Sequence, residues 1–134
     1  MFNSRVSMRG WRELFSVDPL PSLLSSGDAA LVYFTRRDLL GEDPGPIDRL
    51  WELPAAKKIL KNQLPDGSWS RSGEQKHPAI NYGLIETWRW FRVLVYQYGF
   101  IRRHPAAERA AEFLFSCQTE DGDFRGILAN QYAT

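Results

Sequence analysis

The chain has 134 residues, of which 43% are hydrophobic, 25% charged and 13% aromatic. This composition excludes disorder and fibrous structure and indicates about one folded domain. Seventeen basic and 16 acidic residues give a formal net charge of +1, which supplies no long-range field for nucleic acid, so no nucleic-acid partner is expected. No apolar run approaches the roughly 20 residues of a membrane span, and no signal peptide is recognisable at the N-terminus. We therefore expect a cytoplasmic protein without a membrane span.

Residues 1–46 are predicted to form a helical lead-in. Asp28 or Ser26 can cap a helix that runs through Leu40, and Gly41 suits its end. A loop should follow over residues 42–46, with a short helical turn over residues 47–53.

Prolines mark the starts of further helices, because a proline at the first helical position loses no hydrogen bond. Pro54, Pro78 and Pro105 are each predicted to begin one. The helix after Pro105 should be about one turn longer than the helix after Pro54. His77 and His104 directly precede two of these prolines, and we interpret them as capping or exposed residues rather than metal ligands.

The segment 79–98 is predicted to be one helix, closed by Gly99. One arc of its helical wheel is apolar and should be buried: Leu84, Trp88, Trp90, Phe91, Leu94, Val95 and Tyr98. The opposite arc mixes polar and apolar side chains: Asn81, Tyr82, Ile85, Glu86, Arg89, Arg92, Val93, Tyr96 and Gln97. This face is either a partly covered packing flank or the lining of a cavity for a mostly apolar ligand. On the second interpretation Tyr82, Glu86 and Arg89 are candidate substrate-binding residues, with Glu86 and Arg89 close enough to interact.

A short motif, Gln-x-x-Asp-Gly-x-aromatic, occurs twice, beginning at Gln63 and again 55 residues later at Gln118. Asp-Gly favours a tight turn, and the aromatic ring is expected to fold back over the glutamine amide. That amide can donate and accept at once, so it should join a carbonyl at one helix end to an N–H at the next. The motif is thus predicted to be a structural staple, formed by Gln63, Asp66, Gly67 and Trp69 and by Gln118, Asp121, Gly122 and Phe124.

Over residues 54–124 these staples resemble the QW repeats of terpene cyclases and protein prenyltransferases, with Phe124 standing where a tryptophan is usual. The order of features is also similar to bacterial and archaeal prenyltransferase/squalene-oxidase-repeat proteins. The resemblance implies an all-α chain forming a partial α/α toroid, with a lead-in over residues 1–46 and two helical repeats over residues 47–134. Because a closed toroid needs more hairpins than this chain supplies, we expect a fragment, the N-terminal part of a larger protein.

The resemblance supplies no catalytic residue, metal site or cofactor. Class II terpene cyclases use an acidic Asp-x-Asp-Asp segment, which this sequence lacks. Protein prenyltransferases hold zinc through Asp, Cys and His, and the only Cys and His residues that this sequence offers are Cys117, His77 and His104. Asp121-Gly122-Asp123 lacks the EF-hand ligand spacing.

Two functions remain open. The first is a segment of a terpenoid cyclase- or prenyltransferase-type protein whose cavity holds an apolar, isoprenoid-like small molecule, with the parent's catalysis undecided. The second is a non-catalytic helical-repeat module that binds a lipid, a peptide or a protein. The apolar sides of the helices at 79–98 and 105–117 also predict self-association through an exposed apolar flank.

Overall fold

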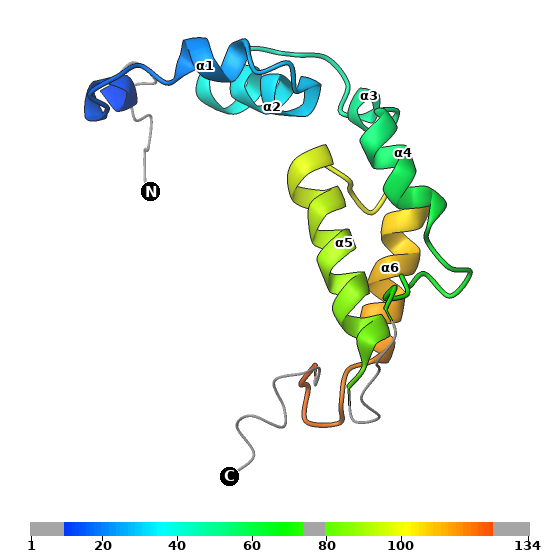
Figure 1. Ribbon diagram of the computed structural model, residues 1–134. Coiled ribbons are helices and arrows are strands. Elements are labelled where there is room, and N and C mark those ends of the chain that lie inside the picture. The colour runs from blue at the N-terminus through cyan, green and yellow to red at the C-terminus, as the bar shows by residue number, and fades with distance from the viewer. Residues whose placement is uncertain (1–9, 74–79, 125–134) are drawn as a thin grey trace. The chain divides into compact units, whose positions relative to one another are not determined.

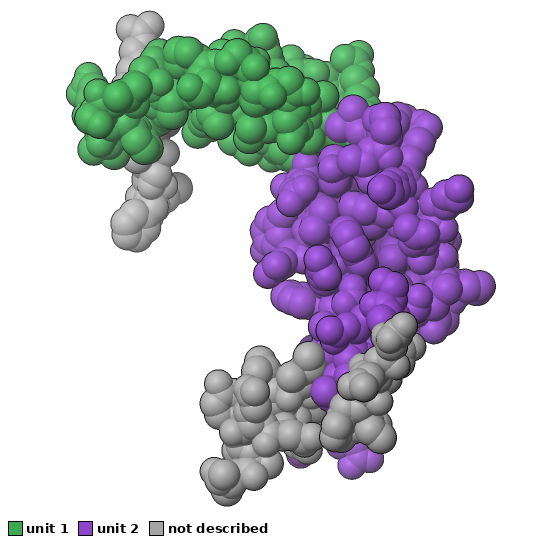
Figure 2. All heavy atoms as spheres, viewed as in Figure 1, with its two compact units in different colours: residues 1–50 green, residues 51–134 purple. Residues whose placement is uncertain are grey.

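The computed structural model describes residues 10–73 and 80–124, and every regular element among them is helical (Figure 1). The all-α prediction is therefore confirmed, whereas the toroid stays a prediction. The chain divides into two compact units, residues 1–50 and residues 51–134 (Figure 2). The first unit contains η1 (Gly10–Leu14), α1 (Leu20–Leu24), α2 (Ala29–Phe34) and η2 (Thr35–Leu39).

The helix expected after Asp28 is present as α2 and its continuation η2. The carboxylate of Asp28 accepts hydrogen bonds from the backbone N–H of Ala30 and Leu31, at 2.9 and 3.1 Å, as predicted for the cap. The last turn, η2, is π-helical, and the chain leaves it at Gly41 with φ of +67°. Helices η1 and α1 were not predicted, because at five residues each they are too short to show helical periodicity.

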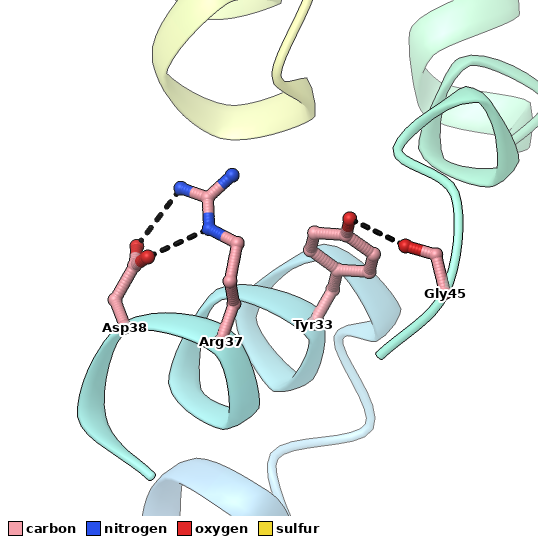
Figure 3. A network of polar contacts seen from close by, with 4 residues as sticks. All are labelled: Tyr33, Arg37, Asp38 and Gly45. Carbon is pink, nitrogen blue, oxygen red and sulfur yellow. Dashed lines mark hydrogen bonds and ion pairs between the residues drawn. The ribbon is translucent and has the colours of Figure 1, made fainter. Parts of the chain in front are cut away.

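A polar cluster on α2 and η2 ties down the loop that follows them (Figure 3). The hydroxyl of Tyr33 donates to the backbone oxygen of Gly45 at 2.8 Å. The guanidinium of Arg37 lies over the Phe34 ring, 4.8 Å from its centroid, and donates twice to the carboxylate of Asp38 at 2.7 and 3.1 Å. The hydrogen bonds to Asp38 raise the pKa of Arg37, so its guanidinium stays charged at physiological pH.

The helices α3 (Asp48–Trp51), α4 (Pro54–Lys61), α5 (Tyr82–Tyr98) and α6 (Pro105–Ser116) complete the chain. Pro54 and Pro105 occupy first helical positions as predicted, and α6 has 12 residues against 8 in α4, the expected extra turn. His77 and Pro78 lie outside the described residues.

Helix α5 begins three residues later than predicted. The side chain of Asn81 accepts from the N–H of Leu84 at 3.0 Å and caps the helix. At the other end Gly99 adopts φ of +65°, the left-handed conformation expected of a glycine C-cap.

The core of the second unit lies where α5 meets α4, α6 and the loop after α4. Trp69, Thr87 and Leu94 are almost fully buried there. Near the start of α4, the Trp51 ring packs 5.4 Å from the Phe100 ring, and its indole N–H points to the backbone oxygen of Gly99 at 3.4 Å. These contacts hold the end of α5 against Trp51, the last residue of α3.

The predicted buried arc of α5 is partly wrong. Leu84 and Leu94 are buried, but Trp88 is 58% exposed, and Glu86, from the opposite arc, is only 8% exposed. Between them Thr87 is fully buried, and its hydroxyl accepts a hydrogen bond from the backbone N–H of Trp69 in the loop after α4. A helical wheel drawn from apolar residues alone does not predict a buried, hydrogen-bonded polar residue such as Thr87.

Candidate functional site

The two motif copies form loops of the same internal geometry, called here loop 1 (residues 63–69) and loop 2 (residues 118–124). In loop 1 the amide nitrogen of Gln63 donates to the oxygen of Gly67 at 3.0 Å, and in loop 2 Gln118 donates to Gly122 at 2.9 Å. The two glycines have φ of +89° and +87°, which confirms the predicted tight turns.

The backbone hydrogen bonds of the loops also match, bond for bond. Leu64 N–H donates to Ser68 at 2.8 Å, and Thr119 N–H donates to Asp123 at 2.8 Å. Each glycine N–H closes its turn at 2.9 Å, onto the oxygen of Leu64 in loop 1 and of Thr119 in loop 2. The sequence repeat is therefore a structural repeat at this level.

Loop 1 acts as a staple to α6. The amide nitrogen of Gln63 donates a second hydrogen bond, to the oxygen of Ala106 at 2.9 Å. The amide oxygen accepts from the guanidinium of Arg109 at 3.1 Å. The carbonyl partner of the amide nitrogen agrees with the prediction, whereas the amide oxygen accepts from the Arg109 side chain rather than from a helix N–H.

The aromatic residue of loop 1 joins two further helices. The indole N–H of Trp69 donates to the oxygen of Ile59 in α4 at 2.9 Å, and its backbone N–H donates to the hydroxyl of Thr87 in α5 at 3.1 Å. Trp69 is 2% exposed. Loop 1 therefore links three helices: the side chain of Trp69 bonds to α4, its backbone bonds to α5, and Gln63 bonds to α6.

The turn of loop 1 is held by Asp66. Its carboxylate accepts from the hydroxyl of Ser68 at 2.6 Å and from the backbone N–H of Ser68 at 3.0 Å. These two hydrogen bonds lower the pKa of Asp66, because both stabilise the ionised form.

The predicted substrate-binding residues are neighbours on the first turns of α5. Arg89 lies 3.9 Å from the carboxylate of Glu86, and the guanidinium of Arg71 lies 5.0 Å from the centroid of the Tyr82 ring. Glu86 is buried while Arg89 is exposed. Their contact with a ligand stays a prediction.

An apolar groove of about 580 Å³ lies between α5 and α6. Tyr82, Glu86 and Arg89 are not among the residues that line it. Phe91, Val95, Phe100, Ile101, Ala107, Ala111 and Phe115 line it, together with Arg102, Glu108 and Glu112. This groove was not predicted, although the sequence contains one signal for it. Ala107 and Ala111 stand one turn apart on α6, and two methyl groups in place of larger side chains leave room between the helices.

His104 and Cys117 stand at the two ends of α6. The Nδ1 atom of His104 accepts from the N–H of Ala106 at 3.0 Å, which confirms the predicted cap. Burial lowers the pKa of His104, and the charge of Arg109 lowers it further, against the opposing effect of Glu52. Cys117 is half-buried and accepts a long contact of 3.8 Å from the Asn81 amide. Among the described residues, no group of three or more His, Cys, Asp or Glu side chains is placed to hold a metal ion.

Comparisons with protein-family models, with curated protein sequences and with solved structures find no match for this chain. Across residues 10–73 and 80–124, none of the helices has both the length and the apolar character needed to cross a membrane.

Proposed function

We propose that this chain is a ligand-binding segment of a terpenoid cyclase- or prenyltransferase-like repeat protein, and that the groove between α5 and α6 holds an apolar, isoprenoid-like molecule. The groove itself is the observation that carries the proposal. Its volume of about 580 Å³ lies within the range of small-molecule sites, which are mostly apolar with a few polar groups.

The lining of the groove suits a branched hydrocarbon chain. Phe91, Phe100 and Phe115 offer aromatic surfaces, and Ala107 and Ala111 leave the space between them open. Phe115 is 67% exposed, so covering it with an apolar ligand removes a large hydrophobic surface from water.

The charges at the groove favour a neutral head group. Arg102 supplies one positive charge, whereas Glu108 and Glu112 supply two negative charges. A diphosphate would meet a net negative surface and lose its hydration without compensation. An isoprenoid alcohol can instead exchange hydrogen bonds with Arg102 and either glutamate.

Binding rather than catalysis is proposed because the chemistry that the resemblance implies has no counterpart here. The sequence contains no Asp-x-Asp-Asp run. The one motif that places two aspartates close together, Asp121-Gly122-Asp123, belongs to loop 2.

The test is competition between ligands for the groove. Farnesol should displace the neutral fluorescent dye Nile red from the protein, and farnesyl diphosphate should do so more weakly. Ala111→Trp fills the groove and should abolish displacement, whereas Ala29→Trp places the same ring at an exposed position of α2 and should leave it unchanged. Phe115→Ala, which removes an exposed lining ring, should weaken it without loss of helix in circular dichroism. Equal displacement by farnesol in wild type and Ala111→Trp would contradict the proposal.

A second function, binding of a basic amphipathic helix, is favoured by the two glutamates on the groove. Glu108 and Glu112 are one turn apart on the exposed side of α6, a spacing that lysines one turn apart on a partner helix can match. In the same assay such a peptide, rather than farnesol, would displace the dye. Raising the salt concentration would weaken the binding of the peptide.

A further inference from the structure

The groove between α5 and α6 has a basic edge on α5. The two helices lie side by side (Figure 1), and Phe91 and Val95 line the groove from α5. At 100° per residue, the next stripe of α5 outward from this lining contains Trp88, Arg92 and Tyr96. All three side chains are exposed. This edge therefore presents one positive charge between two aromatic rings.

The opposite edge, on α6, is acidic. Glu108 and Glu112 line the groove there and are exposed, one helical turn apart. Like charges at this spacing destabilise a helix, so a cation placed between them is favourable. Among the residues that the structure describes, the side chains of Glu108, Glu112 and Arg92 form no ion pair or hydrogen bond.

The charged groups of the two edges lie at about the same level along the groove. Helices α5 and α6 run in opposite directions on either side of a short connection, residues 99–104 (Figure 1). Arg92 stands nearly two turns before that connection, whereas Glu108 and Glu112 stand about one and two turns after it.

A two-fold axis parallel to the groove brings the two kinds of edge together. Such an axis places α5 of each copy against α6 of the other and leaves every residue at its own level along the groove. Arg92 of each copy then meets Glu108 and Glu112 of the other, so the same charge contact forms twice. Opposite charges placed in this way steer two surfaces together and set their register.

Apolar side chains beside these charges supply hydrophobic area for the contact. Tyr96 is 77% exposed, Trp88 is 58% exposed, and Ile101, at the connection end of the groove, is 49% exposed. Exposed apolar side chains that gather around a few polar groups are typical of protein interaction surfaces. Covering them in a dimer removes this area from water.

We propose that this chain forms a two-fold symmetric dimer in which the grooves of two copies face each other and Arg92 of each copy pairs with Glu108 and Glu112 of the other. The interface is isologous, so it closes at two copies. The proposal goes beyond ligand binding and does not depend on it, because the contact uses the edges of the groove rather than its floor.

The first experiment is sedimentation velocity of the full chain over a wide concentration series, without ligand. The average mass should rise with concentration and level off at the mass of a dimer. Added salt should weaken association, because screening weakens the contact between arginine and glutamate. Since no ligand is present, the result does not depend on whether farnesol binds.

The second experiment reverses the charge of each edge in turn. Arg92→Glu makes the α5 edge acidic, and the double variant Glu108→Lys/Glu112→Lys makes the α6 edge basic. Each variant alone places like charges together at both contacts and should weaken association by about tenfold or more. An equimolar mixture should restore the dimer, because the mixed pair has opposite charges at both contacts.

The matched control is Lys61→Glu, which makes the same charge change as Arg92→Glu at an exposed position of α4 outside the groove. It should leave association unchanged. Circular dichroism checks that every variant keeps the helix content of the wild type, which is expected because all the substituted side chains are exposed.

Four results would overturn the proposal. The wild-type chain could stay monomeric up to its solubility limit, or its mass could rise well beyond that of a dimer. The two folded charge variants could associate as strongly as the wild type, which would place the contact on another surface. Their mixture could also stay as weakly associated as each variant alone.

Discussion

Two glycines with nearly the same backbone conformation differ in their surroundings. Gly67 and Gly122 have φ of +89° and +87°, so an alanine at either position carries about 1–2 kcal/mol of conformational strain. Only at Gly67 does the new Cβ atom meet the backbone of α6, at 2.2 Å, which adds about 1–3 kcal/mol of overpacking. Urea denaturation should show Gly67→Ala to be clearly the less stable variant. Equal losses would contradict the tight seat of α6 on loop 1.

The two aromatic residues of the repeat provide a second matched pair. Trp69 is 2% exposed and donates through its indole N–H to Ile59, so Trp69→Ala should cost about 3–5 kcal/mol. Phe124 is 47% exposed, and Phe124→Ala should cost less than about 1 kcal/mol in the monomer. Unfolding midpoints in urea compare the two directly, and similar losses would show that the Phe124 ring contributes as much to stability as the buried Trp69 ring.

His104 couples the start of α6 to pH. Its Nδ1 atom must be unprotonated to accept from Ala106, and its pKa in the folded chain lies below the ordinary value of 6.5. The unfolded chain therefore binds the proton first, so this contribution is complete above pH 6.5 and is lost as the pH falls through the lowered folded pKa. The slope of stability against pH between pH 7 and 5 should flatten in His104→Asn, which keeps a capping oxygen without titrating in this range. An unchanged slope would show that other groups cause it.

At the scale of helices, Thr87 anchors α5 to loop 1. Thr87→Val keeps the shape but leaves the buried N–H of Trp69 without its acceptor, which should cost about 1–3 kcal/mol. Thr87→Ser keeps the acceptor and loses one methyl group, at a cost of about 1 kcal/mol. Denaturant unfolding of both variants separates the contribution of the hydrogen bond to the free energy of unfolding from that of packing. A valine variant as stable as wild type would show that the hydrogen bond contributes nothing.

Local signals predicted most of these helices correctly. Asp28, Pro54, Pro105 and Gly99 mark helix ends because their preferences depend only on adjacent backbone. The repeat also predicted both turns, since Asp-Gly fixes their conformation within a few residues.

What the sequence could not provide was the direction in which each element faces. Trp88 was assigned to the core by its apolar character, yet the buried side of α5 contains Thr87, hydrogen-bonded to Trp69, and Trp88 is exposed. The groove was missed for a similar reason. Its space is left by two small side chains, Ala107 and Ala111, which are ordinary helix formers in the sequence. That space forms a groove only because Phe91 and Phe115 also line it.

At the scale of the molecule, the second unit contains the partners for its own tertiary hydrogen bonds. Trp51 reaches Gly99, Gln63 reaches Ala106 and Trp69 reaches Thr87, and all of these residues lie within 51–134. We therefore expect a chain of residues 51–134 to keep its helical circular dichroism, to unfold cooperatively, and to be destabilised by Trp69→Ala as strongly as the full chain.

The matched control for that prediction is a chain of residues 63–134, which keeps loop 1, α5 and α6 but lacks α3 and α4. It loses the oxygen of Ile59 that accepts from Trp69 and the Trp51 ring that packs on Phe100 and His104. The Trp69 indole N–H then has no helix carbonyl to meet, and the Phe100 end of α5 loses its aromatic cover, so cooperative unfolding should disappear. A cooperative transition of similar midpoint in both fragments would show that α4 contributes nothing to the stability of α5 and α6, whereas its loss in both would show that the second unit depends on residues 1–50.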